Sequence, residues 1–373
     1  MRNTFYILSA LFMILSSCGD DKGYFISGTV DGLEDGKKVY VSELDGKTRT
    51  PVVIDTGVVK DGKFEIDLKE RDLPVLSFLR FEGINGNMIF ISENEEVEFN
   101  IHKDSIRTSR VTGGKENKAL FEYLDHLNAL NKKIGNLQRE MRSKMSQGEP
   151  EELQELREAQ MELQENDKNF KVELFNRNKD TYLAVMLLSD MLNSKNQSSA
   201  EVREMYAEIS DRIKKTDLAK DLERSLETMK AAEVGSKAPG FSGPTPDGKE
   251  ISLEDNLGKV TVVDFWAAWC KPCRIENPNL VRTYNKYKDQ GLNIISVSLD
   301  RPGQKDRWVE AIEADKLEQW DHVSNLQFWQ EPIAQKYGVK AIPATFILDE
   351  NGVIVAKNLR GEALAEKIGE LLK

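Results

Sequence analysis

The residues best suited to chemistry are two cysteines, Cys270 and Cys273, which are separated by Lys271 and Pro272. They follow an apolar run typical of a buried strand and precede a helix-forming segment. A thiolate at a helix N-terminus faces unpaired backbone N–H groups and the positive end of the helix dipole, which favours ionisation. Pro272 suits the first turn, where a missing N–H has no consequence. The pattern predicts disulfide exchange, with Cys270 as the exposed nucleophile and Cys273 as the sulfur that resolves the mixed disulfide.

A spacing of three residues brings the two sulfurs close enough to form a disulfide without unfolding the helical turn. Cys-x-x-Cys can also be half of a zinc site. The chain, however, has three cysteines and three histidines in all, with no second Cys-x-x-Cys and no closely spaced histidine pair. We therefore expect no metal site and no cofactor other than the redox-active Cys270–Cys273 disulfide.

The composition argues against several other functions. The 373 residues carry a formal net charge of −11, so the chain lacks the basic face that nucleic-acid binding requires, and we expect no nucleic-acid partner. Two segments, Gly57–Lys63 and Gly243–Lys249, match a nucleotide-binding P-loop up to its lysine. The hydroxyl residue that would bind Mg²⁺ is replaced by Phe64 and Glu250, so hairpin turns are expected at both places.

Residues 1–17 have the pattern of a bacterial lipoprotein signal peptide. One basic residue precedes an apolar run over residues 5–15, which is too short to cross a bilayer, and the run ends in Leu-Ser-Ser-Cys18, which resembles a lipobox. We expect cleavage before Cys18, acylation of that cysteine, and a tether over residues 18–23. The protein would then be lipid-anchored in the cell envelope and face the periplasm, where disulfides persist.

The rest of the chain divides into three blocks, which predict a multidomain protein. Residues 24–112 contain short apolar or alternating runs between Asp-Gly and Asn-Gly pairs, a pattern typical of an antiparallel β sandwich or barrel-like domain. Residues 113–233 are rich in helix formers, with no glycine or proline from 151 to 234, and predict an α-helical region. Residues 234–373 alternate strand and helix patterns and predict an α/β domain.

The expected elements follow these patterns. In the first block, strands are expected at Tyr24–Val30, Lys38–Glu43, Val52–Ile54, Phe64–Leu68, Val75–Phe81, Met88–Ile91 and Val97–Ile101. In the second, helices are expected over Glu116–Met145 and from starts at Pro150, Asp180, Ser198 (with Glu201 completing a capping box) and Thr216. The first two of these would pair as a hairpin of long helices, and a coiled-coil dimer remains an alternative to a solvated spacer. In the third, strands are expected at Lys259–Phe265, Leu292–Leu299, Ala344–Leu348 and Val353–Leu359, and helices at Pro272–Lys288, Lys305–Ala314, Pro332–Tyr337 and Glu362–Leu372.

The last block, from about Ala238 onward, resembles the thioredoxin-fold domain of the TlpA/ResA-like envelope disulfide reductases. The matching segments are, in order, Ala238-Pro239-x-Phe241, Asp247-Gly248-Lys249, Asp264-Phe265-Trp266-Ala267-x-Trp269-Cys270-x-Pro272-Cys273-Arg274, Glu276-x-Pro278, Val339-x-Ala341-Ile342-Pro343-Ala344-Thr345-Phe346 and Asp349-x-x-Gly352. The resemblance implies that Pro343 is a cis-proline beside the dithiol. It also implies that the backbone around Ile342 pairs with an extended substrate segment.

The resemblance also implies roles for two carboxylates. Glu276 matches the acidic residue of the family that manages protons for the second cysteine, and Asp264 takes the place of the buried thioredoxin carboxylate. Trp266 and Trp269 are expected to form an apolar platform at the dithiol, with a pure core role as the alternative for Trp266. The residues expected to contact substrate are Trp269, Lys271, Pro272 and Ile342.

The first block resembles a β domain of unknown function that precedes such thioredoxin domains in envelope lipoproteins, and no functional residue carries over from it. The resemblance rests on Gly28, Val39–Val41, Ile54-Asp55, Asp61-Gly62-Lys63-Phe64 and Gly113-x3-Asn117.

Together these patterns predict a membrane-anchored thiol–disulfide oxidoreductase of the protein disulfide reductase type. Its expected partners are disulfides of envelope proteins or apocytochrome cysteines, a membrane electron donor and, through acylated Cys18, the lipid bilayer. A peroxiredoxin-like peroxidase is an alternative, although Ala267 stands where a Thr or Ser would help to bind a peroxide. A binding lipoprotein that captures a partner through residues 24–232 is another. The direction of electron flow stays open, because Lys271 beside Cys270 favours an oxidising disulfide whereas the family resemblance implies a reductant.

Overall fold

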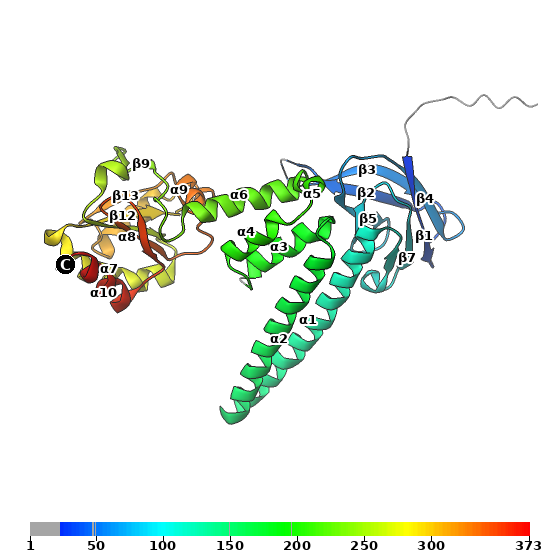
Figure 1. Cartoon of the computed structure of the whole chain (residues 1–373), viewed down its shortest axis with the longest axis horizontal. Coiled ribbons are helices and arrows are strands. Elements are labelled where there is room, and N and C mark those ends of the chain that lie inside the picture. The colour runs from blue at the N-terminus through cyan, green and yellow to red at the C-terminus, as the bar shows by residue number, and fades with distance from the viewer. Residues whose placement is uncertain (1–22, 47, 49, 149, 195) are drawn as a thin grey trace, which may run out of the picture. The chain divides into compact units, whose positions relative to one another are not determined.

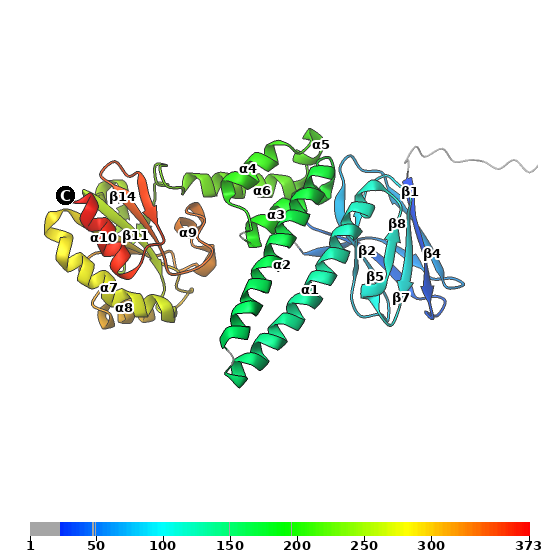
Figure 2. The ribbon, with the colours of Figure 1, turned by 60° about the horizontal axis from the view of Figure 1, so that its bottom comes forward.

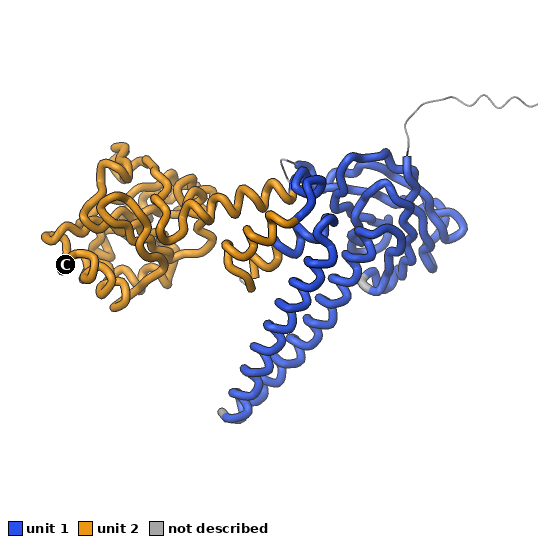
Figure 3. The backbone as a smooth tube through the Cα atoms, viewed as in Figure 1, with its two compact units in different colours: residues 1–188, 209–217 blue, residues 189–208, 218–373 orange. Residues whose placement is uncertain are grey.

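The computed structural model describes residues 23–46, 48, 50–148, 150–194 and 196–373. The predicted signal peptide, the lipidation site Cys18 and all but the last residue of the predicted tether lie outside the described residues. The described residues form two compact units, one within residues 1–188 and 209–217 and the other within residues 189–208 and 218–373 (Figure 3). Within the described part of the chain, every helix is too short or too polar to span a bilayer.

The first unit begins with two four-stranded sheets, whose strand orders are β4-β1-β7-β8 and β3-β2-β5-β6 (Figures 1 and 2). The strands are β1 (Gly23–Asp31), β2 (Lys38–Leu44), β3 (Pro51–Val58), β4 (Lys63–Lys69), β5 (Val75–Phe81), β6 (Met88–Ser92), β7 (Val97–His102) and β8 (Arg110–Thr112). Alternate side chains of β4 and β7 are buried, as expected for strands with one face on a core. Phe64 packs on Phe81 and Phe90 on Phe99, with ring centroids 5.4 and 5.1 Å apart, so the two sheets share one apolar core. The predicted sandwich is confirmed.

Two features of the sandwich differ from the sequence prediction. Strands β1 and β7 pair in parallel, whereas every other pair of neighbours in these two sheets is antiparallel. Between β1 and β7, the chain passes through strands of the other sheet. A chain that crosses to another sheet can return parallel to its first strand, whereas a hairpin turn always reverses its direction. Strand β8 was not predicted, because three residues are too few to display an alternating pattern.

The helical part of the first unit is dominated by an antiparallel hairpin of α1 (Lys115–Gln147) and α2 (Pro150–Arg177) (Figures 1 and 2). The α1 helix ends at Gly148, which adopts a left-handed φ of 75° that favours glycine. The imidazole of His126 stacks on the ring of Phe170 at 3.7 Å, and its Nε2 lies 2.9 Å from a carboxylate oxygen of Asp167. The predicted helix hairpin is therefore confirmed.

The remaining helices are α3 (Tyr182–Ser194), α4 (Ser199–Ala207), α5 (Asp211–Lys214) and α6 (Asp217–Ala231). Ser198 caps α4, and the Glu201 carboxylate accepts the Ser198 backbone N–H, which confirms the predicted capping box. Helix α3 begins two residues after the predicted start at Asp180. Helix α5 was missed, because a single turn carries no periodicity.

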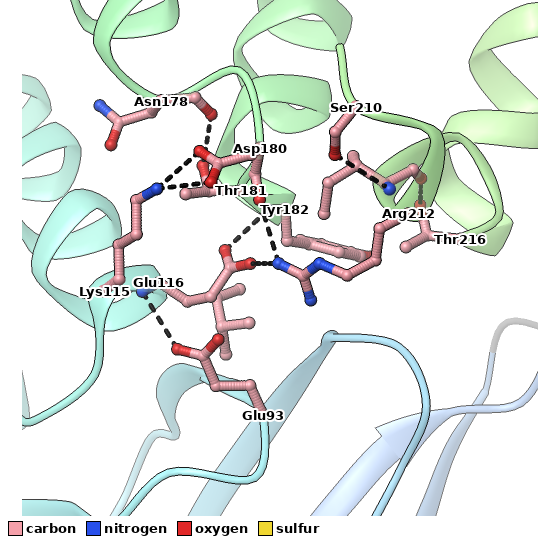
Figure 4. A network of polar contacts seen from close by, with 12 residues as sticks. Glu93, Lys115, Glu116, Asn178, Asp180, Thr181, Tyr182, Ser210, Arg212 and Thr216 are labelled. Atoms are coloured by element: carbon pink, nitrogen blue, oxygen red, sulfur yellow. Dashed lines mark hydrogen bonds and ion pairs between the residues drawn. The ribbon is translucent and has the colours of Figure 1, made fainter.

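A polar network ties the sandwich to the helices inside the first unit (Figure 4). Glu116, in the first turn of α1, is buried; its carboxylate accepts the Tyr182 backbone N–H at 2.7 Å and a guanidinium N–H of Arg212 at 3.2 Å. The carboxylate of Glu93, in the turn after β6, accepts the Glu116 backbone N–H at 3.1 Å. Burial raises the pKa of Glu116 to about 7, the Tyr182 hydrogen bond opposes that rise, and the nearby Glu93 charge adds to it.

The second unit contains a five-stranded sheet of order β13-β12-β11-β14-β15. Its strands are β11 (Val260–Trp266), β12 (Leu292–Ser298), β13 (Asp321–Val323), β14 (Ala344–Asp349) and β15 (Ile354–Lys357); its helices are α7 (Lys271–Tyr287), α8 (Lys305–Ala314), α9 (Pro332–Lys336) and α10 (Gly361–Leu371). Strand β11 runs parallel to β12 and antiparallel to β14. All seven residues of β11 are buried, so both faces of this central strand are covered. This is the predicted thioredoxin-type α/β sheet.

Both P-loop-like segments are turns. Gly57–Lys63 ends β3 and turns into β4, where Lys60 and Lys63 exchange backbone hydrogen bonds. Gly243–Lys249 spans the hairpin of β9 (Ser242–Pro244) and β10 (Glu250–Ser252), closed by a 2.8 Å bond from Thr245 N–H to Lys249 C=O. The turns are confirmed at both places. The hairpin is confirmed for Gly243–Lys249, whereas Gly57–Lys63 joins β3 and β4, which belong to different sheets.

Candidate active site

The dithiol lies where the central strand gives way to a helix. Cys270 and Cys273 form a disulfide, with Cα atoms 5.3 Å apart. Cys270 is the N-cap residue of α7, and its Sγ accepts the backbone N–H of Cys273 at 3.2 Å. Pro272 lies in the first turn of α7, where it removes an N–H that has no partner within the helix. The strand-to-helix placement that the sequence predicted is confirmed.

The exposure of Cys270 differs from expectation. Its exposed fraction is 4%, against 1% for Cys273, so neither cysteine is open to solvent in the disulfide state. Both belong to the apolar core cluster of the second unit. The prediction of an exposed Cys270 was wrong for this state, because the N-cap position sits over the end of a strand that is itself buried.

Asp264 lies within β11 and is 6% exposed. The hydroxyl of Ser296 donates to its carboxylate at 3.4 Å, and the indole N–H of Trp320 donates to that hydroxyl oxygen at 3.0 Å. Burial raises the pKa of Asp264 to about 7; the Ser296 hydrogen bond opposes the rise, the Glu276 charge adds to it, and the Arg360 charge opposes it. This carboxyl group therefore changes protonation state near neutral pH.

Glu276 is half-buried on α7, one turn beyond Cys273. One carboxylate oxygen accepts the Gly361 backbone N–H at 2.6 Å, and the other accepts the side-chain amide of Asn279 at 2.9 Å. Gly361 is the first residue of α10, so Glu276 places its negative charge at the N-terminus of that helix. Glu276 thus fixes α10 against α7.

The peptide bond between Ile342 and Pro343 is cis, as the resemblance implied. Pro343 is buried and Ile342 is half-buried. The Pro343 carbonyl accepts a guanidinium N–H of Arg360 at 2.6 Å. Arg360 thereby joins this bend to the start of α10.

The two tryptophans before the dithiol have different environments. Trp266 is 1% exposed and lies in the core, 5.9 Å from the His322 ring, so the core alternative holds for it. Trp269 is 42% exposed, donates its indole N–H to the Leu299 carbonyl at 3.1 Å, and has its ring 5.4 Å from that of Phe328. Lys271 and Pro272, which follow in the same segment, are exposed. Ile342 belongs to a different segment of the chain.

Sequence reasoning missed Asp300, which holds the loop that leads to Cys270. Asp300 is 1% exposed, and one of its carboxylate oxygens accepts both the Ala268 backbone N–H at 3.0 Å and the Ser298 hydroxyl at 2.7 Å. One signal in the sequence could have indicated Asp300. It lies two residues after β12, and the carboxyl ends of adjacent parallel strands, here β11 and β12, meet at one edge of the sheet.

Sequence reasoning also missed the surroundings of two other residues. Arg274 forms a two-point ion pair with Asp315, with one contact at 2.7 Å, and Asn277 donates to the same carboxylate at 2.7 Å. Phe328 and Trp329 pack beside Trp269. Nothing in the sequence connects these distant segments to the dithiol. Among the described residues, no group of three or more His, Cys, Asp or Glu side chains is arranged to hold a metal ion.

The chain is similar to proteins that are named for thiol–disulfide exchange. A thiol–disulfide oxidoreductase ResA from Bacillus thuringiensis is 32% identical over 149 residues, which cover 38% of this chain and 78% of that relative. The chain belongs to the ResA family of thiol–disulfide oxidoreductases. It is therefore an enzyme of thiol–disulfide exchange.

Other proteins and two family models are similar to parts of this chain. A thioredoxin-like protein YneN from Bacillus subtilis is 35% identical over 122 residues, 33% of this chain and 69% of the relative. The solved thioredoxin domain of a thiol–disulfide oxidoreductase from Bacteroides vulgatus is 38% identical and covers 38% of this chain and 99% of its own, with a TM-score of 0.35. The AhpC/TSA family model matches residues 234–357, and a domain of unknown function, DUF4369, matches residues 24–120.

Proposed function

We propose that this ResA-family enzyme is a lipid-anchored protein disulfide reductase of the cell envelope, in which Cys270 attacks the substrate and Cys273 resolves the intermediate. The observation that carries the assignment of roles is the hydrogen bond from the Cys273 backbone N–H to the Cys270 sulfur at the start of α7. The same N–H, together with the helix dipole, would stabilise a thiolate on Cys270 and not on Cys273.

The reaction begins from the reduced dithiol. The Cys270 thiolate attacks one sulfur of a substrate disulfide; a Cys270–substrate disulfide forms, and the second substrate sulfur leaves as a thiolate that takes up a proton. Cys273 then loses its proton and attacks the Cys270 sulfur, which releases the other substrate thiol and closes the Cys270–Cys273 disulfide. Two electrons pass to the substrate, and a membrane dithiol donor would return two electrons to the enzyme.

Asp264 is the proposed acceptor of the Cys273 proton. Its carboxyl is buried in β11, and burial raises its pKa to about 7, so it gains and releases a proton readily at neutral pH. Glu276, one turn after Cys273, raises the pKa of Asp264 through its charge. We assign Glu276 to the tuning of this proton transfer.

An extended substrate segment would lie across Trp269, Lys271 and Pro272, which are the exposed residues next to the dithiol. Within the described part of the chain, the Ile342 backbone forms no hydrogen bond, so its polar groups are free to pair with that segment. Pro343, held through its carbonyl by Arg360, fixes the bend.

Two observations favour disulfide exchange over peroxide reduction. Ala267, three residues before Cys270, is fully buried and offers no hydroxyl to a peroxide. Arg274 is committed to Asp315 and to the Ala268 carbonyl, so it is not available as a peroxide ligand.

Residues 1–18 support the envelope location: the lipobox-like segment predicts acylation of Cys18 and a periplasm-facing enzyme. Disulfides of envelope proteins, including those of apocytochromes c, are its proposed substrates. The Cys18→Ala variant tests the anchor, since we expect it to leave the membrane fraction and to lose incorporation of a labelled fatty acid. A variant that keeps both properties removes the anchor from the proposal.

The activity is tested by insulin reduction with dithiothreitol, in which the wild type is compared with Cys270→Ser. We expect the wild type to accelerate insulin precipitation and the variant to match the uncatalysed rate. Equal rates for the two proteins would refute the proposed role of Cys270. Oxidation of the reduced enzyme by hydrogen peroxide much faster than by a peptide disulfide would favour the peroxidase instead.

A further inference from the structure

A groove of about 520 Å³ lies beside the dithiol on the second unit. One wall is the active-site loop at Ala268 and Trp269, and the other is α8 with the segment that leads into it. Its polar and charged lining residues are Arg274, Asp300, Arg301, Gln304, Arg307 and Glu310. Because Trp269 precedes Cys270 directly, any chain bound at the dithiol over Trp269 has this groove as its neighbour.

Two of the charged groups in the groove are already engaged. Asp300 is buried and accepts the Ala268 N–H and the Ser298 hydroxyl. Arg274 is held in its ion pair with Asp315. Both residues build the wall of the groove, and the charge of Arg274 is already paired with that of Asp315.

Arg301 and Arg307 are exposed and have different surroundings. The Arg301 guanidinium lies 4.6 Å from the centroid of the Phe328 ring, a cation–π contact that positions it without occupying its N–H donors. Within the described residues, neither Arg301 nor Arg307 forms an ion pair. Glu310 is the one exposed carboxylate among the described lining residues, so the exposed charges of the groove are two guanidinium groups and one carboxylate.

An aromatic surface adjoins these arginines. The rings of Trp269, Phe328 and Trp329 lie within 6.3 Å of one another, centroid to centroid, and Trp269 is 42% exposed. A partly exposed aromatic cluster next to two guanidinium groups suits a polypeptide that presents an apolar side chain beside a carboxylate.

We propose that this groove is a substrate subsite, in which Arg301 and Arg307 bind the carboxylate of an acidic side chain close to the reacting cysteine, while Trp269 and Phe328 contact its apolar neighbour. The proposal rests on the disulfide reductase function and adds to it a preference for acidic segments. Guanidinium groups suit this role because they donate two parallel hydrogen bonds to a carboxylate.

The test uses two disulfide-bonded peptides that are identical except for Glu or Gln two residues from the reacting cysteine. We expect the wild type to reduce the Glu peptide with about a tenfold higher kcat/KM than the Gln peptide, in line with one charge-assisted hydrogen-bonded pair. Because the groove is open to solvent, this ratio should shrink towards one at high salt.

The variant is Arg301→Gln/Arg307→Gln, and we expect its Glu-to-Gln ratio to fall close to one. The matched control is Lys305→Gln, which removes a cation from the start of α8 outside the groove lining and should keep the wild-type ratio. Tryptophan fluorescence confirms that each variant is folded.

The outcomes separate the subsite from the function. If the wild type reduces both peptides through Cys270 at equal rates, or if the double variant keeps the preference, the subsite is wrong and the reductase function stands. If Lys305→Gln loses the preference as fully as the double variant, general surface charge and not the groove sets it, and the subsite is again wrong. If the wild type reduces neither peptide, the proposed reductase function falls, and the subsite falls with it.

Discussion

Asp264 is expected to make the second unit less stable as pH rises, and an Asp264→Asn substitution should remove that effect. The pKa of this buried carboxyl is raised from its ordinary value of 3.8 to about 7. At 1.36 kcal/mol per pH unit, ionising the carboxyl inside the fold costs about 4 kcal/mol more than in the unfolded chain. The ionised carboxyl therefore lowers the free energy of unfolding, and the proposed role in proton transfer would explain why such a group is buried here.

The sign of the pH dependence follows from which state holds the proton. Below pH 3.8 the carboxyl is neutral in both states and imposes no penalty. Between pH 3.8 and about 7 the folded state holds the proton and the unfolded state has lost it, so the free energy of unfolding falls as pH rises. Above about pH 7 the full loss is reached. Asparagine does not titrate, so the stability of the variant relative to the wild type should increase by about 3 kcal/mol from pH 5 to pH 8.

The assay is urea unfolding of the oxidised proteins at pH 5 and pH 8, followed by tryptophan fluorescence. All five tryptophans lie between residues 266 and 329, so the signal reports on the second unit alone. The control is Asp289→Asn, which removes the same charge at an exposed position and should give equal differences at both pH values. In the insulin assay we expect the Asp264→Asn variant to be about a hundredfold slower, because it lacks a proton acceptor.

Two results would refute this reasoning. If the difference in unfolding free energy between Asp264→Asn and the wild type is the same at pH 5 and pH 8, the carboxyl does not titrate abnormally. If the variant gains stability at pH 8 but keeps full activity, Asp264 is buried for structural reasons and another group accepts the proton.

Three further predictions concern residues that position the site or stabilise the first unit. Asp300→Ala leaves the Ala268 N–H and the Ser298 hydroxyl without their buried acceptor, so the second unit should lose about 2–4 kcal/mol of unfolding free energy in the same fluorescence assay, with slower insulin reduction. In the first unit, burial raises the pKa of Glu116 from 4.5 to about 7, so protection of the first α1 amides from hydrogen exchange, corrected for intrinsic rates, should fall between those pH values. Glu116→Gln should weaken this dependence and leave the part set by Glu93, whose pKa burial also raises. Phe99→Ala should cost the sandwich about 3–5 kcal/mol, measured by urea unfolding followed by circular dichroism, whereas Phe25→Ala, at a 45% exposed position, should cost little.

Local signals explain the parts of the fold that the sequence predicted well. Pro272 marks the start of α7, Gly148 ends α1, and Ser198 with Glu201 begins α4, because each of these residues satisfies a backbone requirement within a few positions. The alternating runs of the sandwich strands are local in the same sense. The dithiol could be predicted from the sequence because its chemistry depends on two elements that are adjacent in the chain, β11 and α7.

The parts that were missed depend on residues far apart in the chain. The parallel pairing of β1 with β7 is set by how the chain crosses between sheets, and no local pattern encodes it. The contact of Asp300 with Ala268 and the packing of Phe328 on Trp269 join segments that only the folded sheet brings together. The burial of Cys270 likewise depends on the surrounding core and not on the Cys-x-x-Cys spacing.

Trapping of the mixed disulfide decides most directly whether Cys270 is the attacking sulfur. Reduced Cys273→Ser and reduced Cys270→Ser proteins are mixed with the same peptide disulfide, the reaction is quenched over time, and the adduct is located by mass spectrometry of the digested protein. We expect Cys273→Ser to accumulate an adduct on Cys270 at least about tenfold faster than Cys270→Ser forms one on Cys273. Equal rates, or faster capture on Cys273, would contradict the assignment of Cys270 as the nucleophile.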